Sequence, residues 1–384
     1  MPPPDKLNIV LSWFMNDWGE FGRTYEKVAI TLSQHERIGH VLVVLPPVRH
    51  PQKISAPFSI QKISKKLSVC TPSVKVIDGS GSFYRFRTWA NETLPGIVFK
   101  NTLKKLGYNK ANTMLWLFPP SRYIETLLES VPHAYKVTQI VDNNTFHSDM
   151  SEKEVAVIDA QYKRLASISD TVITSSDLNF DFFKDLNSNT FKFINAVDSQ
   201  FIGIASELPH KTNNTRPKLL YVGWISQRTD MALLKYIAQN RPDYDVIIAG
   251  PDEGPLEESN IQALDNVTYL GKVAYSTLPE LFSSCDICLI PHKDNKYSQS
   301  MSPLKLFQYL ASGRPVVSTD IGGIDHWKAL IHIANSYAQF IEQIDYVLVN
   351  DNIELSKTRI SEARKETWEI RVNDMLNTIL AKHS

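Results

Sequence analysis

Residues 300–319 read SMSPLKLFQYLASGRPVVST and combine the signals of a helix with those of a buried strand. Ser302 and Pro303 predict the helix start, because a serine oxygen can accept a free backbone N–H and proline has no N–H to leave unpaired. Gly313 predicts the helix end, and residues 315–319 predict a short buried strand. The helix carries apolar side chains at helical spacing: Leu304, Leu306, Phe307, Leu310 and Ala311. A helix followed directly by a buried strand is typical of an α/β sheet.

Lys305 lies in the first turn of this predicted helix, where the positive end of the helix dipole disfavours a cation by a few tenths of a kcal/mol. Either Lys305 is simply solvated, or an anion lies between it and the free N–H groups of that turn. Arg228 follows a strand-and-glycine stretch, YVGWISQR, and could face the same side of the fold. Arg228, Lys305 and the N–H groups after Ser302 could then hold a phosphate or diphosphate. An exposed lysine, and an arginine paired with a neighbouring carboxylate, remain the alternative.

Charge is balanced over the 384 residues, which argues neither for nucleic acid as a partner nor for an acidic tail. Residues 49–110 are the exception, with nine Lys and three Arg against Asp78 and Glu92, a net charge of +10. The segment also contains five aromatic residues, a composition that suits an anionic membrane surface or a lipid diphosphate. A solvated basic face is the alternative. The aromatic residues are Phe83, Tyr84, Phe86, Trp89 and Phe99.

The cysteines and the N-terminus indicate a cytoplasmic protein, and the basic segment would place it at the inner face of the plasma membrane. Three cysteines are too few, and odd in number, for a secreted disulfide framework. Cys285 and Cys288 form a CDIC stretch inside an apolar run, and buried structural cysteines are expected there rather than a metal or redox site. The N-terminus lacks the pattern of a signal peptide, and no run approaches the length of a membrane span.

Short apolar runs alternate with helical patterns through both halves of the chain. Runs that are apolar on both faces indicate parallel sheets covered by helices, and residues 199–217 read as a linker between two doubly wound α/β domains. A last helical pattern spans about 356–380. Strands are predicted at 6–14, 40–47, 73–79, 113–120, 136–143, 171–176, 190–195, 218–224, 245–250, 266–270, 287–291 and 315–319. Helices are predicted near 23–34, 121–131, 151–167, 230–240, 277–284 and 303–311.

Open sheets of this kind bind ligands at the carboxyl ends of their strands, so the turns after the strands are the places to search. In the second domain, Gly223 and Gly250 end two predicted strands. In the first domain, Gly19 and Gly22 could let the backbone approach a ligand, although their spacing is not G-x-G-x-x-G and a turn with positive φ explains them equally well.

Asp142 follows another first-domain strand and, with His147 nearby, could face an acceptor hydroxyl as a general base. Duty as a helix cap or in a turn is the alternative for Asp142. The sequence alone does not decide between them.

The order of these segments resembles the glycosyltransferases of the GT-B fold, in particular family 4 and its bacterial polysaccharide members. The likeness covers about residues 171–370 and rests on TVITSSDL, FINAVD, LLYVGW, DVIIAG, NVTYLG, LPELFSSCDICLIP, SPLKLFQYLASGRPVVST and ARKETWEIRV. It implies two Rossmann-like domains facing across a cleft, with residues 1–205 on the acceptor side and residues 206–365 on the nucleotide-sugar side. It also implies that residues 366–384 form a terminal helix that crosses back to the first domain.

The resemblance also assigns residues to the donor. The helix beginning at Pro303 matches the segment that meets the donor, so Ser302, Pro303 and Leu304 would face the diphosphate. The family commonly has two glutamates eight positions apart, and this chain has Ser300 and Gln308 in those places. Gln308 stands where the second glutamate accepts hydrogen bonds from the ribose, and an amide can still accept one.

Other positions depart from the family pattern. Trp224 and Thr229 occupy the places of a common Arg and Lys, so activity depends on whether the neighbouring Arg228 substitutes for them. Asn195 and Asp198 match an Asn-Gly-Val-Asp pattern whose frequent role is structural, with Ala196 replacing the glycine.

The resemblance implies a retaining glycosyltransferase that moves a sugar from a UDP- or GDP-sugar to a hydroxyl of a glycan or lipid-linked glycan in polysaccharide biosynthesis. Arg228 and Lys305 would stabilise the leaving diphosphate, and Asp142 would serve the acceptor. No acidic DxD-type cluster demands a metal, so we expect no cofactor and no metal dependence. A nucleotide-sugar epimerase, which should need no acceptor, and a non-catalytic GT-B partner subunit, which should show little turnover, remain alternatives.

Overall fold

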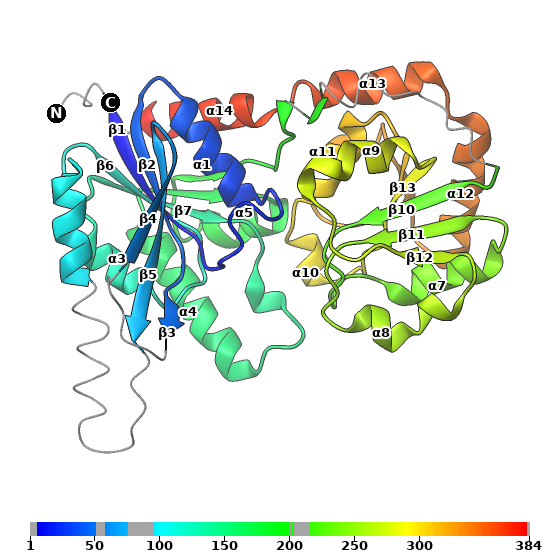
Figure 1. Cartoon of the computed structure of the whole chain (residues 1–384), viewed down its shortest axis with the longest axis horizontal. Helices are drawn as coiled ribbons and strands as arrows, with labels where there is room; N and C mark the ends of the chain where they lie inside the picture. The colour runs from blue at the N-terminus through cyan, green and yellow to red at the C-terminus, as the bar shows by residue number, and fades with distance from the viewer. Residues whose placement is uncertain (1–5, 51–57, 76–95, 200, 203–214, 382–384) are drawn as a thin grey trace.

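The computed structural model describes residues 6–50, 58–75, 96–199, 201–202 and 215–381. The described residues form two α/β domains that lie side by side, each built on one twisted sheet (Figure 1). Both sheets are parallel apart from one strand. The fold class predicted from the sequence, two doubly wound domains facing across a cleft, is confirmed.

The first sheet contains nine described strands in the order β3-β5-β2-β1-β6-β7-β8-β9, with β4 paired to β5 outside this path. Helices α1 (Thr24–Gln34), α3 (Ile124–Ser130), α4 (Glu152–Ile168) and α5 (Asp177–Lys184) flank it. The strands are β1 (Leu7–Ser12), β2 (Ile38–Val44), β3 (Val48–His50), β4 (Phe58–Ser64), β5 (Leu67–Lys75), β6 (Thr113–Leu117), β7 (Tyr135–Ile140), β8 (Thr171–Thr174) and β9 (Thr190–Lys192).

The second sheet contains six described strands, all parallel, in the order β12-β11-β10-β13-β14-β15. The strands are β10 (Lys218–Val222), β11 (Asp245–Ala249), β12 (Val267–Tyr269), β13 (Ile287–Ile290), β14 (Val316–Thr319) and β15 (His332–Ala334). The described α-helices that follow β10 in the chain are α7 (Met231–Asn240), α8 (Pro255–Ser259), α9 (Leu278–Ser283), α10 (Lys296–Gln299), α11 (Leu304–Ala311), α12 (Tyr337–Asn350), α13 (Ile353–Ala363) and α14 (Trp368–Ala381).

Alternating side chains of the central strands pack on opposite layers of helices, as the doubly apolar strand pattern predicts. In β10, Leu220 and Val222 join α9 and α11 in one buried cluster, whereas Leu219 and Tyr221 join α7 and α12 in another. The second sheet is therefore covered on both faces. Its ligand-binding edge, at the carboxyl ends of its strands, is left open toward the first domain.

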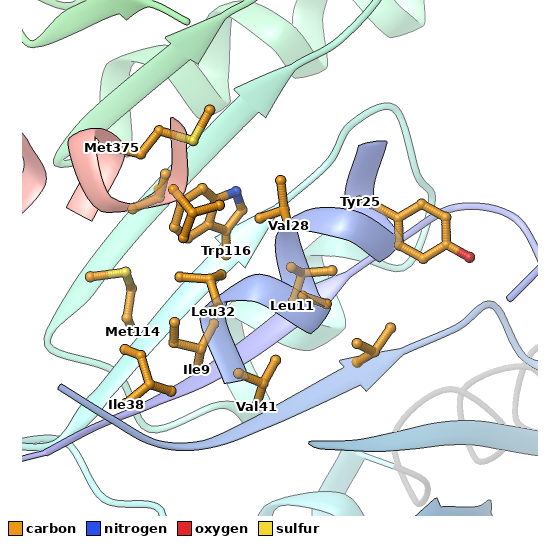
Figure 2. Packing of buried hydrophobic residues seen from close by; sticks show 14 of the residues in the cluster. Ile9, Leu11, Tyr25, Val28, Leu32, Ile38, Val41, Met114, Trp116 and Met375 are labelled. Carbon is orange, nitrogen blue, oxygen red and sulfur yellow. The ribbon is translucent and has the colours of Figure 1, made fainter. Parts of the chain in front are cut away.

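The last helix, α14, belongs to the core of the first domain. Met375 of α14 packs with Val28 and Leu32 of α1 and with Trp116 of β6 (Figure 2). In Figure 1, α13 and α14 run across the top of the molecule from the second domain to the first. The predicted crossing of the terminal helix is confirmed.

One continuous terminal helix over 356–380 is a wrong prediction, since the chain forms α13 and α14 with a break between them. At the break, the N–H of Val197 donates to the carbonyl of Glu366 at 2.9 Å, and the N–H of Trp368 donates to the carbonyl of Val197 at 3.0 Å. These strand-like bonds to the first domain replace helical ones, because a helix cannot offer its backbone groups to a second segment.

The basic segment at 49–110 is only partly described. Phe83, Tyr84, Phe86 and Trp89 lie outside the described residues. Phe99 is buried in a cluster with Leu103 and Tyr108, so the expectation that it faces a membrane is wrong. The apolar face of its helix packs on the sheet instead.

The cysteine prediction is confirmed. Cys285 and Cys288 are free and fully buried, with their sulfurs 3.8 Å apart. Among the described helices, none is both long enough and apolar enough to cross a membrane.

Candidate active site

A cavity of about 450 Å³ lies between the two domains at the carboxyl ends of their central strands. Trp13 and Asp142 line it from the turns after β1 and β7 of the first sheet. Gly223, Gly250 and His292 line it from the turns after β10, β11 and β13 of the second sheet. This is the place where open parallel sheets bind ligands.

The start of α11 faces this cavity, and Ser302, Pro303, Leu304, Lys305 and Gln308 all line it. The predicted serine cap is wrong, because α11 begins at Leu304 with Pro303 as the N-cap, and no side chain of the described residues caps it. The Ser302 hydroxyl instead accepts from the backbone N–H of Asn195 in the first domain, at 3.1 Å. A helix start without a cap keeps donors for a ligand.

Lys305 points back toward the turn after β10. Its Nζ lies 3.2 Å from Nε2 of His292 and 4.1 Å from the centre of the Tyr221 ring. A Cβ atom on Gly223, whose φ is +149°, would lie 2.5 Å from that Nζ, so glycine leaves the room that the lysine occupies. Burial lowers the pKa of Lys305 well below its usual range, and the charge of Arg228 lowers it further.

Arg228 lies in the same cavity, with Nη1 3.6 Å from a carboxylate oxygen of Asp142 across the cleft. Its guanidinium lies 5.6 Å from the centre of the Tyr297 ring. The ion pair explains how Arg228 is oriented, and it leaves guanidinium edges toward the cavity. The alternative weighed from sequence, an arginine paired with a carboxylate, therefore describes part of its environment.

His292 contacts Lys305 and lies close enough to Arg228 to feel its charge. It is buried, and burial lowers its pKa well below the usual range, with Lys305 and Arg228 lowering it further. A neutral imidazole can accept from the lysine through Nε2 without adding a third positive charge. Its Nδ1 has no hydrogen-bond partner among the described residues. The cluster of Arg228, His292 and Lys305 thus places the Arg228 cation and the Lys305 amine, whose charged form burial disfavours in the free protein, around an uncapped helix start.

Gly19 and Gly22 are not among the described residues that line the cavity; their neighbours Glu20, Phe21 and Arg23 are. The Gly19 N–H donates to Glu26 at 3.0 Å. A Cβ atom on Gly22, whose φ is +59°, would lie 2.7 Å from the ring of Tyr275 in the second domain. The structure thus accounts for Gly22 by close packing between the domains.

Gln308 and Ser300, the two positions that depart from the family glutamates, have different surroundings. Gln308 lines the cavity and hydrogen-bonds Tyr275. Ser300 is fully buried at the domain contact, where its hydroxyl accepts from the N–H of Asn143 at 3.2 Å. A nucleotide in the cavity could therefore reach Gln308.

Trp224 and Thr229, which replace the common Arg and Lys, also differ. Trp224 lines the cavity, with the Arg23 guanidinium 4.6 Å from its ring centre. Thr229 is buried, and its hydroxyl bonds that of Tyr221 at 3.1 Å. Only the tryptophan is placed to contact a ligand.

Several residues that line the cavity were not predicted as site residues from the sequence, notably Arg23, Tyr275, His292 and Tyr297. His292 directly follows the strand run ICLIP, so the strand-end rule could have found it. Tyr275 and Tyr297 lie in short helical turns that no periodic pattern marks. In the described part of the chain, no group of three or more His, Cys, Asp or Glu side chains is arranged to hold a metal ion.

Comparison with known proteins finds a family that resembles the second domain. Residues 216–350, which contain α11 and all six described strands of the second sheet, match the family model "Glycosyl transferases group 1". Over these residues the second domain is similar to that family. The predicted resemblance to GT-B glycosyltransferases is confirmed.

One curated relative is TuaH of Bacillus subtilis, whose name assigns it to teichuronic acid biosynthesis as a glycosyltransferase. It is 25% identical over 252 residues, which are 61% of this chain and 63% of the relative. The match thus spans less than two thirds of that relative's length.

Solved structures agree on the fold over nearly the whole chain. Sucrose-phosphate synthase from Thermosynechococcus elongatus has a TM-score of 0.73 at 16% identity and covers 99% of this chain and 100% of its own. HepE of Anabaena, solved in complex with UDP and glucose, has a TM-score of 0.64 at 13% identity and covers 98% of this chain and 99% of its own. At these identities the likeness shows the GT-B fold alone.

Proposed function

We propose that this protein is a glycosyltransferase that moves a sugar, with retention of anomeric configuration, from a nucleoside-diphosphate sugar to a hydroxyl of a glycan or lipid-linked glycan. The observation that carries the proposal is the convergence of Lys305 and Arg228 at the uncapped start of α11, inside a cleft between two domains. The group 1 family match of the second domain and the name of the Bacillus subtilis relative support a role in polysaccharide biosynthesis.

The chemistry follows from where charge develops. When the glycosidic bond of the donor breaks, negative charge grows on the leaving diphosphate. Cations and backbone N–H groups that are already in place stabilise this charge more strongly in the transition state than in the ground state, and so lower the barrier. Lys305, Arg228 and the first turn of α11 are such groups. Their two positive charges support a reaction that needs no metal ion.

Asp142 has two roles in this proposal. Its carboxylate lies 3.6 Å from Arg228 and holds the guanidinium at the cleft. It also lines the cavity from the first domain, where the acceptor hydroxyl would bind. Gln308 would meet the ribose, and Gly223 and Gly250 would let the backbone approach the donor.

UDP is the first donor nucleotide to test, with GDP as the alternative, because HepE was solved with UDP and glucose. The identity of the sugar follows from the assay. A panel of UDP- and GDP-sugars is incubated with the protein and a bacterial cell-envelope glycan, and release of nucleoside diphosphate is followed.

The same assay separates the alternatives. A transferase releases nucleotide in proportion to acceptor. An epimerase converts the donor with no acceptor present, and a non-catalytic partner subunit shows little turnover even when the correct acceptor is present. Donor conversion without acceptor would contradict the proposal.

We also propose that the basic first-domain segment contacts an anionic membrane, at the inner face of the plasma membrane. The described part of this segment supports it, because the exposed Ile60 and Ile63 of β4 lie close in sequence to the exposed Lys62 and Lys65. Apolar side chains flanked by cations suit an anionic lipid surface. Co-flotation with anionic but not neutral liposomes, weakened in Lys62→Glu/Lys65→Glu, is expected; absence of flotation with anionic liposomes would overturn it.

A further inference from the structure

The segment before α11, Ser300-Met301-Ser302, is called the 300–302 loop here. It belongs to the second domain but is held by the first. The carbonyl of Ser300 accepts from the Asn179 side-chain amide at 2.7 Å and from the Ser176 hydroxyl at 2.9 Å. The carbonyl of Ser302 accepts from the Asn195 amide at 2.6 Å. All three of these hydrogen bonds are buried.

The first-domain donors are themselves fixed. The side-chain oxygen of Asn195 accepts from Thr24 in the first turn of α1 at 2.9 Å. Ser176 caps α5, where its hydroxyl accepts from the N–H of Asn179. The Asn179 amide therefore reaches the loop from the first turn of α5, and the Asn195 amide is held by the first residue of α1, so both have little freedom to follow the loop if it moves.

The opposite side of the loop is packed against its own domain. A Cβ atom on Gly323 would lie 2.7 Å from the carbonyl oxygen of Met301, and one on Gly322 would overlap the carbonyl of Gln299. The loop thus lies between the Gly322–Gly323 turn and the first domain. Its position cannot change while both contacts persist.

Only two residues separate Ser302 from Lys305, and the loop leads directly into α11. The direction of the uncapped N–H groups and of Lys305 therefore depends on where the loop lies. Because misplacing preorganised groups by about 1 Å costs rate, the first domain sets part of the geometry of a site on the second.

We propose that Asn179 and Asn195 are positioning residues that hold the 300–302 loop, so that the phosphate-binding start of α11 is in place only when the two domains are docked. This inference rests on the proposed donor site at α11. It gives a role to Asn179 and Asn195, two first-domain residues that hydrogen-bond the loop before the donor helix.

Asn179 gives the cleaner test, because it is fully buried and, unlike Asn195, is not among the described residues that line the cavity. Asn179→Leu removes the amide with little change in size. The matched control is Lys272→Met, which removes an ion pair between the domains, Lys272 with Glu20 at 2.8 Å, that does not touch the loop. Calorimetric titration of UDP and GDP into the full-length proteins is compared with their unfolding temperatures.

We expect Asn179→Leu to weaken the binding of the preferred nucleotide at least about tenfold, and Lys272→Met to leave it within about twofold. If Asn179→Leu does not fold, Asn179→Asp serves, since an acid suits the first turn of α5 while its carboxylate opposes the Ser300 carbonyl. Wild-type affinity in both Asn179 variants, or equal weakening in Lys272→Met, would overturn the inference. Binding of neither nucleotide by the wild-type protein would instead overturn the proposed donor site.

Discussion

Two helices begin at the cleft, α1 in the first domain and α11 in the second, and neither is capped by a side chain of the described residues. The first turn of α1 contains Glu26, which accepts from the N–H of Gly19 at 3.0 Å, and its N-cap residue Arg23 pairs with Asp17 at 3.0 Å. The first turn of α11 contains Lys305 and no acidic residue. One helix start thus has two carboxylates beside it, while the other has free donors and a lysine and no acidic residue in its first turn.

This difference bears on where the proposed diphosphate would bind. Both helices follow the same α/β logic, and an uncapped start is an anion site only if no nearby carboxylate already occupies it. In the first domain, Glu26 lies in the first turn of α1 and Asp17 pairs with its N-cap residue. The diphosphate is therefore expected at α11, and the first domain is left for the acceptor.

The largest expected effect comes from Arg228. Arg228→Gln removes a cation from the leaving diphosphate, and we expect kcat to fall by about 10², the usual effect of losing one oxyanion-stabilising donor. Initial rates of nucleotide release measure it. Arg216→Gln, at an exposed ion pair of the same domain, is the matched control. A rate unchanged in Arg228→Gln would show that Arg228 does not replace the missing family residues.

Lys305→Met is expected to weaken UDP or GDP binding at least about tenfold, or about 1.4 kcal/mol. Calorimetric titration measures it, with Lys328→Met, at an exposed lysine, as the control.

Glu26→Gln tests the helix start of the first domain in the same titration. A change at α1 should leave nucleotide affinity within about twofold, because the nucleotide is expected at α11. If Glu26→Gln changes nucleotide affinity as much as Lys305→Met, then nucleotide binding does not depend on α11 alone.

Gln308→Leu is expected to weaken nucleotide binding by about fivefold, since one hydrogen bond contributes roughly 1 kcal/mol. UDP lacking a ribose hydroxyl gives the diagnostic measurement. The wild-type protein should bind this analogue less well than UDP, and the variant should bind both alike. An undiminished preference in the variant would place the ribose elsewhere.

The smallest expected effect is that of chelation. Lys305 and Arg228 supply the charge that a metal would otherwise bring, so EDTA should change the transfer rate by less than about twofold. The control is the same assay with Mg²⁺ added back. A rate that collapses in EDTA and returns with Mg²⁺ would show that the two cations do not suffice.

Much of the fold could be predicted, because the patterns behind it are local. Strand β10 is specified by a few neighbouring residues. The same is true of helix α11 and of the turn at Gly313 that ends it. The break between α13 and α14 could not be predicted, since it depends on Val197, far away in the sequence. The same holds for Ser302, whose partner is the N–H of Asn195 rather than its own helix.

The candidate site was predictable to the same extent. Strand-end reasoning brought Arg228, Lys305 and Asp142 into one cavity, as the structure has them. It could not show that Lys305 turns toward His292, because that contact joins the first turn of α11 to the turn after β13 through a space that Gly223 leaves. The grouping of residues follows from topology, whereas their charge states follow from burial.

The most direct test of an anion at Lys305 is the proton balance of nucleotide binding. Burial and Arg228 lower the pKa of Lys305 in the free protein, and a bound diphosphate should raise it. Binding should therefore take up a proton, and affinity should fall as pH rises between the free and the bound pKa. Titrations of fully ionised UDP or GDP in two buffers of different ionisation enthalpy measure this uptake. We predict uptake in the wild-type protein and in His292→Gln and none in Lys305→Met; equal uptake in Lys305→Met would contradict the account.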